Sequence, residues 1–419
     1  MSYTLLKGEF VIRYPDLPRQ GPEPDGDTIK FRPDTPALVE TLPRRSGSPP
    51  DINPRGISVR LEAVDALETH FEETHQQLEN ANAARDRLLA RLGFTGVTYF
   101  RDAPNKVESC DQDSIRGHVL SNGIDANGRL IAFVHPGDNA ALDGSSVFVD
   151  TALAEQSVNA ELLSSGLAFP AFYATLPADL RTRLAELSTA ARTAQPPAGL
   201  WPASTADPDG AATVPGLDAL RTLVMWPKLF RRLVPYLAAG NADLDGFDAW
   251  LRADPVHRDD RLFRLDVLET ANLHDVVHAT GRTVRLTVWP ETLVIDPDPA
   301  TPGAPTTGTP AAAGDVVVVA VLPDPVGADA GREVVTLLNA TATPVDLTGW
   351  RLLDAAGGRT DLSGALPPGG VTQVTAAATM SLGNRGDQIV LLDAAGNLID
   401  KVDYRANQVA PGRTICIGR

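Results

Sequence analysis

Residues 57–68 read Ile-Ser-Val-Arg-Leu-Glu-Ala-Val-Asp-Ala-Leu-Glu and carry the most informative pattern in the first half of the chain. The apolar, β-branched run that ends at Val64 is typical of a strand. Asp65 stands at the end of this strand and could supply a metal ligand, while Glu68 could orient a water molecule. A plainer interpretation fits the same residues, because Asp65 could cap a helix and Glu68 could complete its capping box.

Outward from this stretch, residues 1–203 alternate short β-rich runs with amphipathic helices. Strands are expected at Phe10–Arg13, Asp27–Arg32, Ile57–Val64, Arg116–Leu120 and Arg129–His135. Helices are expected at Glu68–Leu92, Leu153–Ser165 and Leu180–Ala194. Strands with helical cover in this order predict a small β-barrel of the OB-like class. The irregular piece Pro33–Gly56 is expected to be a loop exposed to solvent.

The rest of the chain divides by composition into three further parts. Residues 204–296 are expected to form a mostly helical middle domain, with helices over Leu217–Ala239, Leu244–Arg252 and Asp259–Thr280 and short strands up to Ile295. Residues 297–314 are rich in Pro, Thr, Ala and Gly, which predicts a flexible linker. Residues 315–419 show short strands with turn signals at close intervals, the pattern of a β-sandwich.

The net charge of −16 restricts the kind of nucleic-acid binding that is possible. None of the segments is basic overall, so any affinity for nucleic acid must come from a local cluster and should be weak and salt-sensitive. No run of about 18 apolar residues is present, and no signal peptide is recognised, so a cytoplasmic protein without a membrane span is expected. The two cysteines, Cys110 and Cys416, lie far apart and do not suggest a disulfide framework.

Two further motifs contain charged residues beside turns. Asp25-Gly-Asp27-Thr28 precedes the second strand, where the glycine allows a carboxylate to turn inward. Asp125-Ala-Asn-Gly-Arg129 is a hairpin turn that opens into a strand. Taken alone, each motif is better explained as a turn and a solvated charge.

Together the three motifs resemble the staphylococcal nuclease family in residue type, order and spacing. The family shows Asp-Gly-Asp-Thr, then an arginine followed after four residues by Asp and after two more by Glu, then Asp-x-x-Gly-Arg. Asp27, Arg60, Asp65, Glu68 and Arg129 occupy these positions here. The resemblance continues through Val158–Ala168 and Gly199-Leu200-Trp201, and it covers about the first half of the chain.

The resemblance implies a hydrolase, a metal-dependent phosphodiesterase that uses Ca²⁺. Asp27, Asp65 and the backbone carbonyl of Ala66 would hold one Ca²⁺ ion. Glu68 would orient or deprotonate the attacking water. The substrate would be DNA or RNA, cut with little sequence preference to leave 3′-phosphates.

The resemblance also assigns the groups that would contact the substrate. Arg60 and Arg129 would bind the phosphate and stabilise charge in the transition state. Phe172 and Tyr173 fall near the base-stacking tyrosines of the family, and the alignment leaves open which of the two corresponds. The family often has Lys-Tyr before its Gly-Arg, where this chain has Ala126-Asn127, so the resemblance assigns no terminal-phosphate contact at this position.

Residues 315–419 resemble the lamin tail domain, an immunoglobulin-like sandwich. The resemblance rests on Glu333–Asn339, Leu347-Thr-Gly-Trp350, Leu382–Asp387 and Asp403-Tyr404. Trp350 is interpreted as core, and no catalytic set is recognised here. Bacterial copies of this domain are often appended to nucleases and other enzymes, so the sandwich could dock a protein partner or present substrate.

The middle segment contains one suggestive pair, His274 and His278, one turn apart on the helix expected there. This spacing suits a metal, but no third ligand is recognised, and a spacer or interaction domain is favoured. Two other functions stay open for the whole chain. One is a non-catalytic scaffold that binds nucleic acid or protein. The other is a nuclease restrained by its middle and tail domains, in which residues 1–203 alone would be more active than the full chain.

Overall fold

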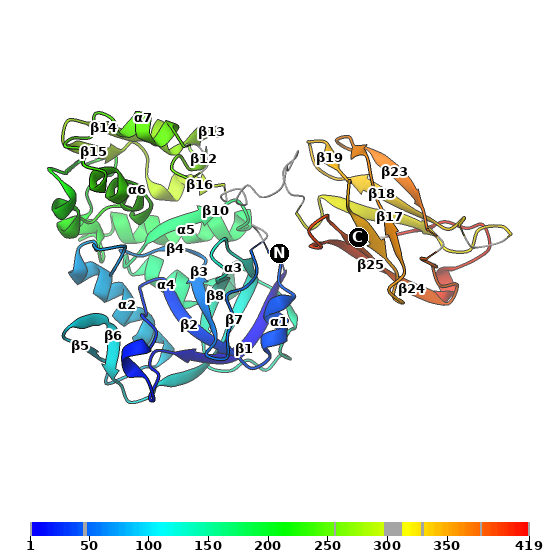
Figure 1. Cartoon of the computed structure of the whole chain (residues 1–419), viewed down its shortest axis with the longest axis horizontal. Coiled ribbons are helices and arrows are strands. Elements are labelled where there is room, and N and C mark those ends of the chain that lie inside the picture. The colour runs from blue at the N-terminus through cyan, green and yellow to red at the C-terminus, as the bar shows by residue number, and fades with distance from the viewer. Residues whose placement is uncertain are drawn as a thin grey trace. The chain divides into compact units, whose positions relative to one another are not determined.

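A computed structural model describes residues 2–44, 48–254, 257–296, 312–327, 331–377 and 379–417 (Figure 1). The chain forms two compact units, Met1–Ala300 and Thr301–Arg419. Most of the linker expected at 297–314 lies outside the described residues. Among the described residues, no helix is long and apolar enough to cross a membrane.

The first unit is built on a closed barrel of five strands, consistent with the OB-like barrel expected from the sequence. The barrel strands are β1 (Ser2–Val11), β2 (Thr28–Pro33), β3 (Ile57–Leu61), β7 (Ser114–Ile124) and β8 (Leu130–Pro136). β1 pairs with both β2 and β7, and the parallel pairing of β3 with β8 completes the ring. Ile57, Val59 and Leu61 alternate into the core, which turns Arg60 to the other face of β3.

Helices and shorter strands surround the barrel. They are α1 (Pro36–Glu40), α2 (Leu78–Leu92), α3 (Thr151–Glu155), α4 (Val158–Ser164), α5 (Ala178–Thr193), β4 (Ala63–Asp65), the hairpin of β5 (Thr98–Phe100) and β6 (Ala103–Ser109), and β9 (Ser146–Phe148). The single helix expected over 153–165 is two helices, because the Ser157 side chain caps the start of α4. The piece 33–56 is not simply exposed, since α1 buries Val39 in the core and Leu42 follows it there.

The helix expected from Glu68 begins only at Leu78. Residues 68–77 form a loop closed at its ends, where Gln76 donates its backbone N–H to the carbonyl of Glu68 at 2.9 Å. The Gln77 side chain accepts from the backbone N–H of Asn80 and caps α2. The capping-box interpretation of Asp65 and Glu68 is therefore wrong, because no helix starts at these residues.

The middle segment shares a sheet with the first 203 residues. The order of this five-stranded sheet is β13–β12–β16–β10–β4, in which β10 (Phe169–Tyr173) and β4 precede the segment and the others belong to it. The helices of the middle segment are α6 (Pro227–Ala238), α7 (Phe247–Arg252) and α8 (Leu273–Val276). Its strands are β11 (Ala212–Thr213), β12 (Arg261–Arg264), β13 (Glu269–Asn272), β14 (Val277–Thr280), β15 (Thr283–Leu286) and β16 (Leu293–Ile295). In Figure 1 these elements lie together at one end of the unit.

The prediction of a helix over 259–280 is wrong, so the segment is mixed rather than mostly helical. β12 pairs with β13 on one side and with β16 on the other, and this sheet pairing overrides the helical periodicity. A second core joins the segment to the rest of the unit, with Trp226, Phe230 and Phe247 packed with Phe169 and Trp201.

The second unit is an antiparallel sandwich, as expected. One sheet has the order β23–β18–β17–β26 and the other β21–β20–β24–β25. The strands are β17 (Val316–Leu322), β18 (Val334–Asn339), β19 (Val345–Asp346), β20 (Arg351–Leu353), β21 (Arg359–Asp361), β22 (Ala365–Leu366), β23 (Val371–Thr375), β24 (Gly386–Leu392), β25 (Leu398–Arg405) and β26 (Ile415–Cys416). Trp350 is buried in the core between them, as the sequence predicted.

Candidate active site

The turn before β2 meets the end of β4, and this junction brings the first two motifs together. The Asp27 carboxylate accepts a hydrogen bond from the backbone N–H of Ala66 at 2.9 Å. Gly26 is required for the approach, since a Cβ there would lie 2.5 Å from the Cβ of Ala66 and 2.8 Å from that of Ala84. The turn therefore seats against α2 and directs the Asp27 side chain toward Asp65.

Arg60 links the two aspartates. Its guanidinium forms an ion pair with Asp27 and donates to Asp65 Oδ1 at 2.7 Å. Burial disfavours its charge, but the two carboxylates outweigh burial and hold the pKa of Arg60 well above its usual value. The same guanidinium helps to keep the pKa of Asp27 below its usual value despite burial.

A second guanidinium, that of Arg231, reaches the same carboxylates from α6. It donates to both oxygens of Asp65 at 3.0 Å and forms an ion pair with Glu68. Sequence reasoning missed this residue. A signal was present, because Lys228, Arg231 and Arg232 stand at helical spacing and so share one face of α6.

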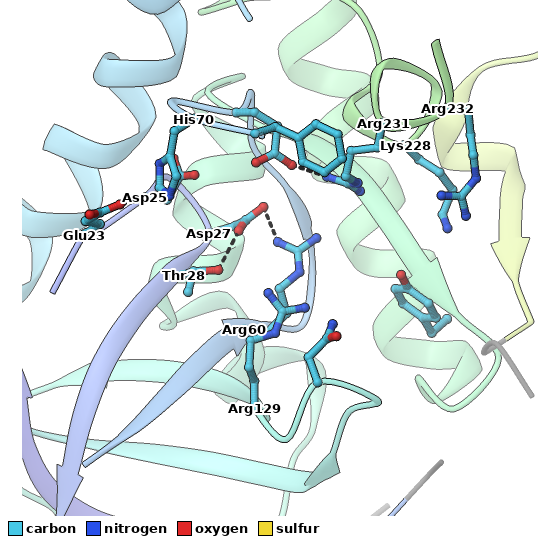
Figure 2. Close-up of a pocket in the computed structure, with 14 residues that line it drawn as sticks. Glu23, Asp25, Asp27, Thr28, Arg60, His70, Arg129, Lys228, Arg231 and Arg232 are labelled. Atoms are coloured by element: carbon cyan, nitrogen blue, oxygen red, sulfur yellow. Dashed lines mark hydrogen bonds and ion pairs between the residues drawn. The ribbon is translucent and has the colours of Figure 1, made fainter. Parts of the chain in front are cut away.

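Asp27, Arg60, Glu68 and Arg231 line a cavity of about 450 Å³, and Asp65 is buried behind them. Its lining comprises Glu23, Asp25, Asp27, Thr28, Arg60, Glu68, His70, Phe71, Asn127, Arg129, Tyr173, Lys228, Arg231 and Arg232. Figure 2 shows Glu23 and Asp25 on one side and the three cations of α6 on the other. The cavity therefore has an acidic wall and a basic wall, with the Asp27–Arg60 pair between them.

The remaining candidates from the sequence divide into those at the cavity and those away from it. Arg129 lines it and is held by Asp125, whose Oδ2 accepts from Nε at 2.7 Å. Tyr173 lines it too, whereas Phe172 is fully buried in the barrel core. Adjacent residues of a strand face opposite sides, so the expectation that Phe172 contacts substrate is wrong.

The acidic groups outnumber the guanidiniums that contact them. Asp25, Asp27, Asp65 and Glu68 lie near Arg60 and Arg231, which leaves an excess of negative charge if all are ionised. Burial, followed by the charges of Asp27 and Glu68, raises the pKa of Asp25 to about 8. Burial also raises the pKa of Glu68, although Arg231 opposes this change.

The donor chemistry of this cluster fits Ca²⁺, because carboxylate and carbonyl oxygens are its usual ligands. In the part of the chain that the structure describes, however, no group of three or more His, Cys, Asp or Glu side chains is arranged to hold a metal. The reason lies in the ion pairs: the guanidiniums of Arg60 and Arg231 stand between the carboxylates. Side-chain movement would have to precede metal binding.

The histidine pair of the middle segment does not form a site. α8 ends at Val276, so His278 lies on β14 and is exposed, while His274 bonds Asp259 through Nδ1 at 2.5 Å. The helical spacing on which the pair depended is therefore absent.

Comparison with known proteins identifies the second unit. The family model of the Lamin Tail Domain matches residues 309–406, in agreement with the resemblance found in the sequence. The comparison gives no support to the staphylococcal nuclease resemblance of residues 1–203, which rests on the motifs and the site described above. No curated protein matches the chain.

Proposed function

We propose that the first unit is a calcium-dependent nuclease that hydrolyses phosphodiester bonds of DNA or RNA with little sequence preference. One observation carries the proposal: Arg60 pairs with Asp27 and Asp65, Arg231 joins Asp65 to Glu68, and Arg129 lines the adjoining cavity. These side chains come from separate parts of the chain. Their convergence at one ion-paired cluster beside the cavity is what a phosphodiesterase site requires. The 3′-phosphate product follows from the family resemblance alone.

Each residue has a role that its position supports. Asp27, Asp65 and the carbonyl of Ala66 would hold the ion, which supplies polarisation of a phosphoryl oxygen when bound. Arg60 and Arg129 would bind phosphate oxygens and offset the charge that develops on them. Glu68 would accept a proton from the attacking water, and its raised pKa suits a general base.

The ion-paired state of the site favours one alternative, a non-catalytic scaffold. Asp65 and Glu68 are occupied by Arg231, and a permanent pairing of this kind would leave no place for a metal. In that case the barrel would bind nucleic acid or protein, and the lamin tail domain would dock a partner.

Cleavage of labelled single-stranded DNA, with added Ca²⁺ or with excess chelator, tests the proposal. Wild-type protein should cut only with Ca²⁺, and Arg60→Ala should lose about a hundredfold or more of the rate. Arg183→Ala is the matched control, because Arg183 pairs with Glu155 and Glu186 on the surface away from the cavity. Absence of cleavage by folded wild-type protein at low salt, with several divalent ions, would establish the scaffold instead.

A further inference from the structure

Arg231 is the one residue of the ion-pair cluster that comes from outside the barrel and its motifs, within the described part of the chain. Its guanidinium spans two carboxylates, with one nitrogen on both oxygens of Asp65 and another on Glu68. Asp65 itself is almost completely inaccessible to solvent. Arg231 therefore supplies positive charge at the position where the proposed function needs a cation.

The helix that carries Arg231 is firmly anchored. Lys228 and Arg232 both bond the buried carboxylate of Asp260, at 2.6 Å and 2.9 Å. Phe230 and Leu233 of the same helix pack in the second core. α6 therefore stays in place, and any release of the carboxylates must come from rotation of the Arg231 side chain into the adjoining cavity.

A guanidinium and a divalent ion compete for the same carboxylate oxygens, because both are positively charged. Both cannot lie within bonding distance of Asp65 without strong repulsion in a buried site. An ion that binds must therefore displace Arg231 and also replace the bonds that it makes. The free energy of that exchange subtracts from the affinity of the site for metal.

We propose that Arg231 is an internal counter-cation that competes with Ca²⁺ and so sets the calcium affinity of the site. The inference rests on the proposed function, because it assumes that Asp65 is a metal ligand. It assigns a determinant of metal affinity to the middle segment, and it makes the barrel and that segment one functional unit.

Isothermal titration calorimetry with Ca²⁺ on the full chain measures the competition without any use of activity. Arg231→Gln should lower the Kd for Ca²⁺ by about tenfold or more relative to wild type, since the competing charge is gone. Arg231→Lys should give a smaller gain, because an ammonium keeps the charge but cannot bridge two carboxylates in the same way. Arg183→Gln is the control and should leave the Kd unchanged, because Arg183 pairs with Glu155 and Glu186 on the surface away from the cavity.

The possible outcomes distinguish failure of the Arg231 inference from failure of the proposed calcium-dependent function. Binding by wild type with an unchanged Kd in both Arg231 variants would overturn the inference and leave the proposed function intact. No binding by wild type or by either variant would overturn both. Loss of the heat of binding in Arg231→Gln/Asp65→Asn would confirm that the gained affinity belongs to this site. If Arg231→Gln fails to fold, judged by circular dichroism, Arg231→Lys alone decides the result.

Discussion

Asn159 fastens α4 to the barrel through three buried hydrogen bonds. Its Oδ1 accepts from Val134 N–H at 2.9 Å, and its Nδ2 donates to the carbonyls of Glu62 and Ala132. Asn159→Ala should lower the free energy of unfolding by about 2 kcal/mol, because Val134 N–H and the Glu62 carbonyl would lose these buried bonds, while the Ala132 carbonyl keeps its bond from Glu62 N–H. Urea unfolding measures the change, and Ser164→Ala at the exposed end of α4 should have little effect. A loss no larger than the control's would contradict this account.

Asp260 balances two cations at the base of α6. Its carboxylate is buried, yet Lys228 and Arg232 keep its pKa below the usual value. Asp260→Asn should cost about 3–5 kcal/mol of unfolding free energy, because it leaves Lys228 charged and buried without its partner.

Thermal and urea unfolding would show the effect of Asp260→Asn. The exposed pair of Asp248 and Arg252 provides the matched change, and Asp248→Asn should barely alter stability. Equal effects of the two substitutions would refute the role given to Asp260.

Single positions differ in how far the sequence could reveal them. The motif residues Asp27, Arg60 and Asp65 were predictable because their spacing matches a known pattern. Phe172 could have been rejected by strand alternation once Tyr173 was placed at the cavity. The sequence shows Arg231 on a basic helix face with Lys228 and Arg232, but its contact with Asp65 could not be predicted, because that contact depends on how α6 docks.

Strands β7 and β8 carry a stacked histidine pair that should make the barrel sensitive to acid. His118 and His135 lie with ring centroids 5.1 Å apart, and His135 Nε2 has no hydrogen-bond partner among the described residues. Burial, with repulsion from His118 and Arg91, lowers the pKa of His135 to about 3 from an ordinary 6.5. Burial also lowers the pKa of His118, against the opposing charge of Asp138.

The sign of the pH effect follows from these shifts. Below pH 6.5 His135 is protonated in the unfolded chain but stays neutral in the folded barrel. The free energy of unfolding therefore decreases as the pH falls toward 3. The contribution of this histidine to the slope of unfolding free energy against pH should approach about 1.4 kcal/mol per pH unit. Urea unfolding between pH 7 and 4 should show a shallower slope for His135→Phe, and an identical slope would exclude the pair as the cause.

Helices and strands were predictable where the local pattern and the packing agree. α5 and the strands β2, β3 and β8 follow their expected ranges closely, since each has a clear period and a turn signal beside it. β1 does not, because it spans Ser2–Val11 and shares only two residues with the expected Phe10–Arg13. The start of α2 was misplaced because the Glu68–Gln77 loop depends on Gln76, whose side chain donates to the Met225 carbonyl of the middle segment. β12 and β13 were missed for a similar reason, because β12 pairs with β16, and this pairing is a tertiary contact.

The complete first unit should fold only when the middle segment is present. Residues 1–203 contribute Phe169, Leu200 and Trp201 to a core that residues 204–296 complete. A fragment of residues 1–296 should unfold cooperatively, whereas a fragment of 1–203 should expose this apolar surface and bind a hydrophobic dye. Circular dichroism and dye fluorescence on the two fragments would test this, and a cooperative, dye-free 1–203 fragment would contradict it.

The domain boundaries could be predicted only in part, because residues 1–203 and 204–296 share one core. Composition separates residues 204–296 from those before them, but the contacts do not, because β16 lies between β10 and β12. The lower boundary of the second unit agrees with the composition. Restraint of the proposed nuclease activity by the middle segment is therefore better tested by changing Arg231 than by truncation at 203.

The parallel pairing of β10 with β16 has a consequence for biosynthesis. Tyr173 leaves the ribosome well before Ile295, its partner in the sheet, since residues 174–294 are translated in between. At about 5–20 residues per second that interval lasts roughly ten seconds. During it the nascent barrel exposes an open strand edge and part of an unfinished core. This interval is when the growing chain is most exposed to aggregation.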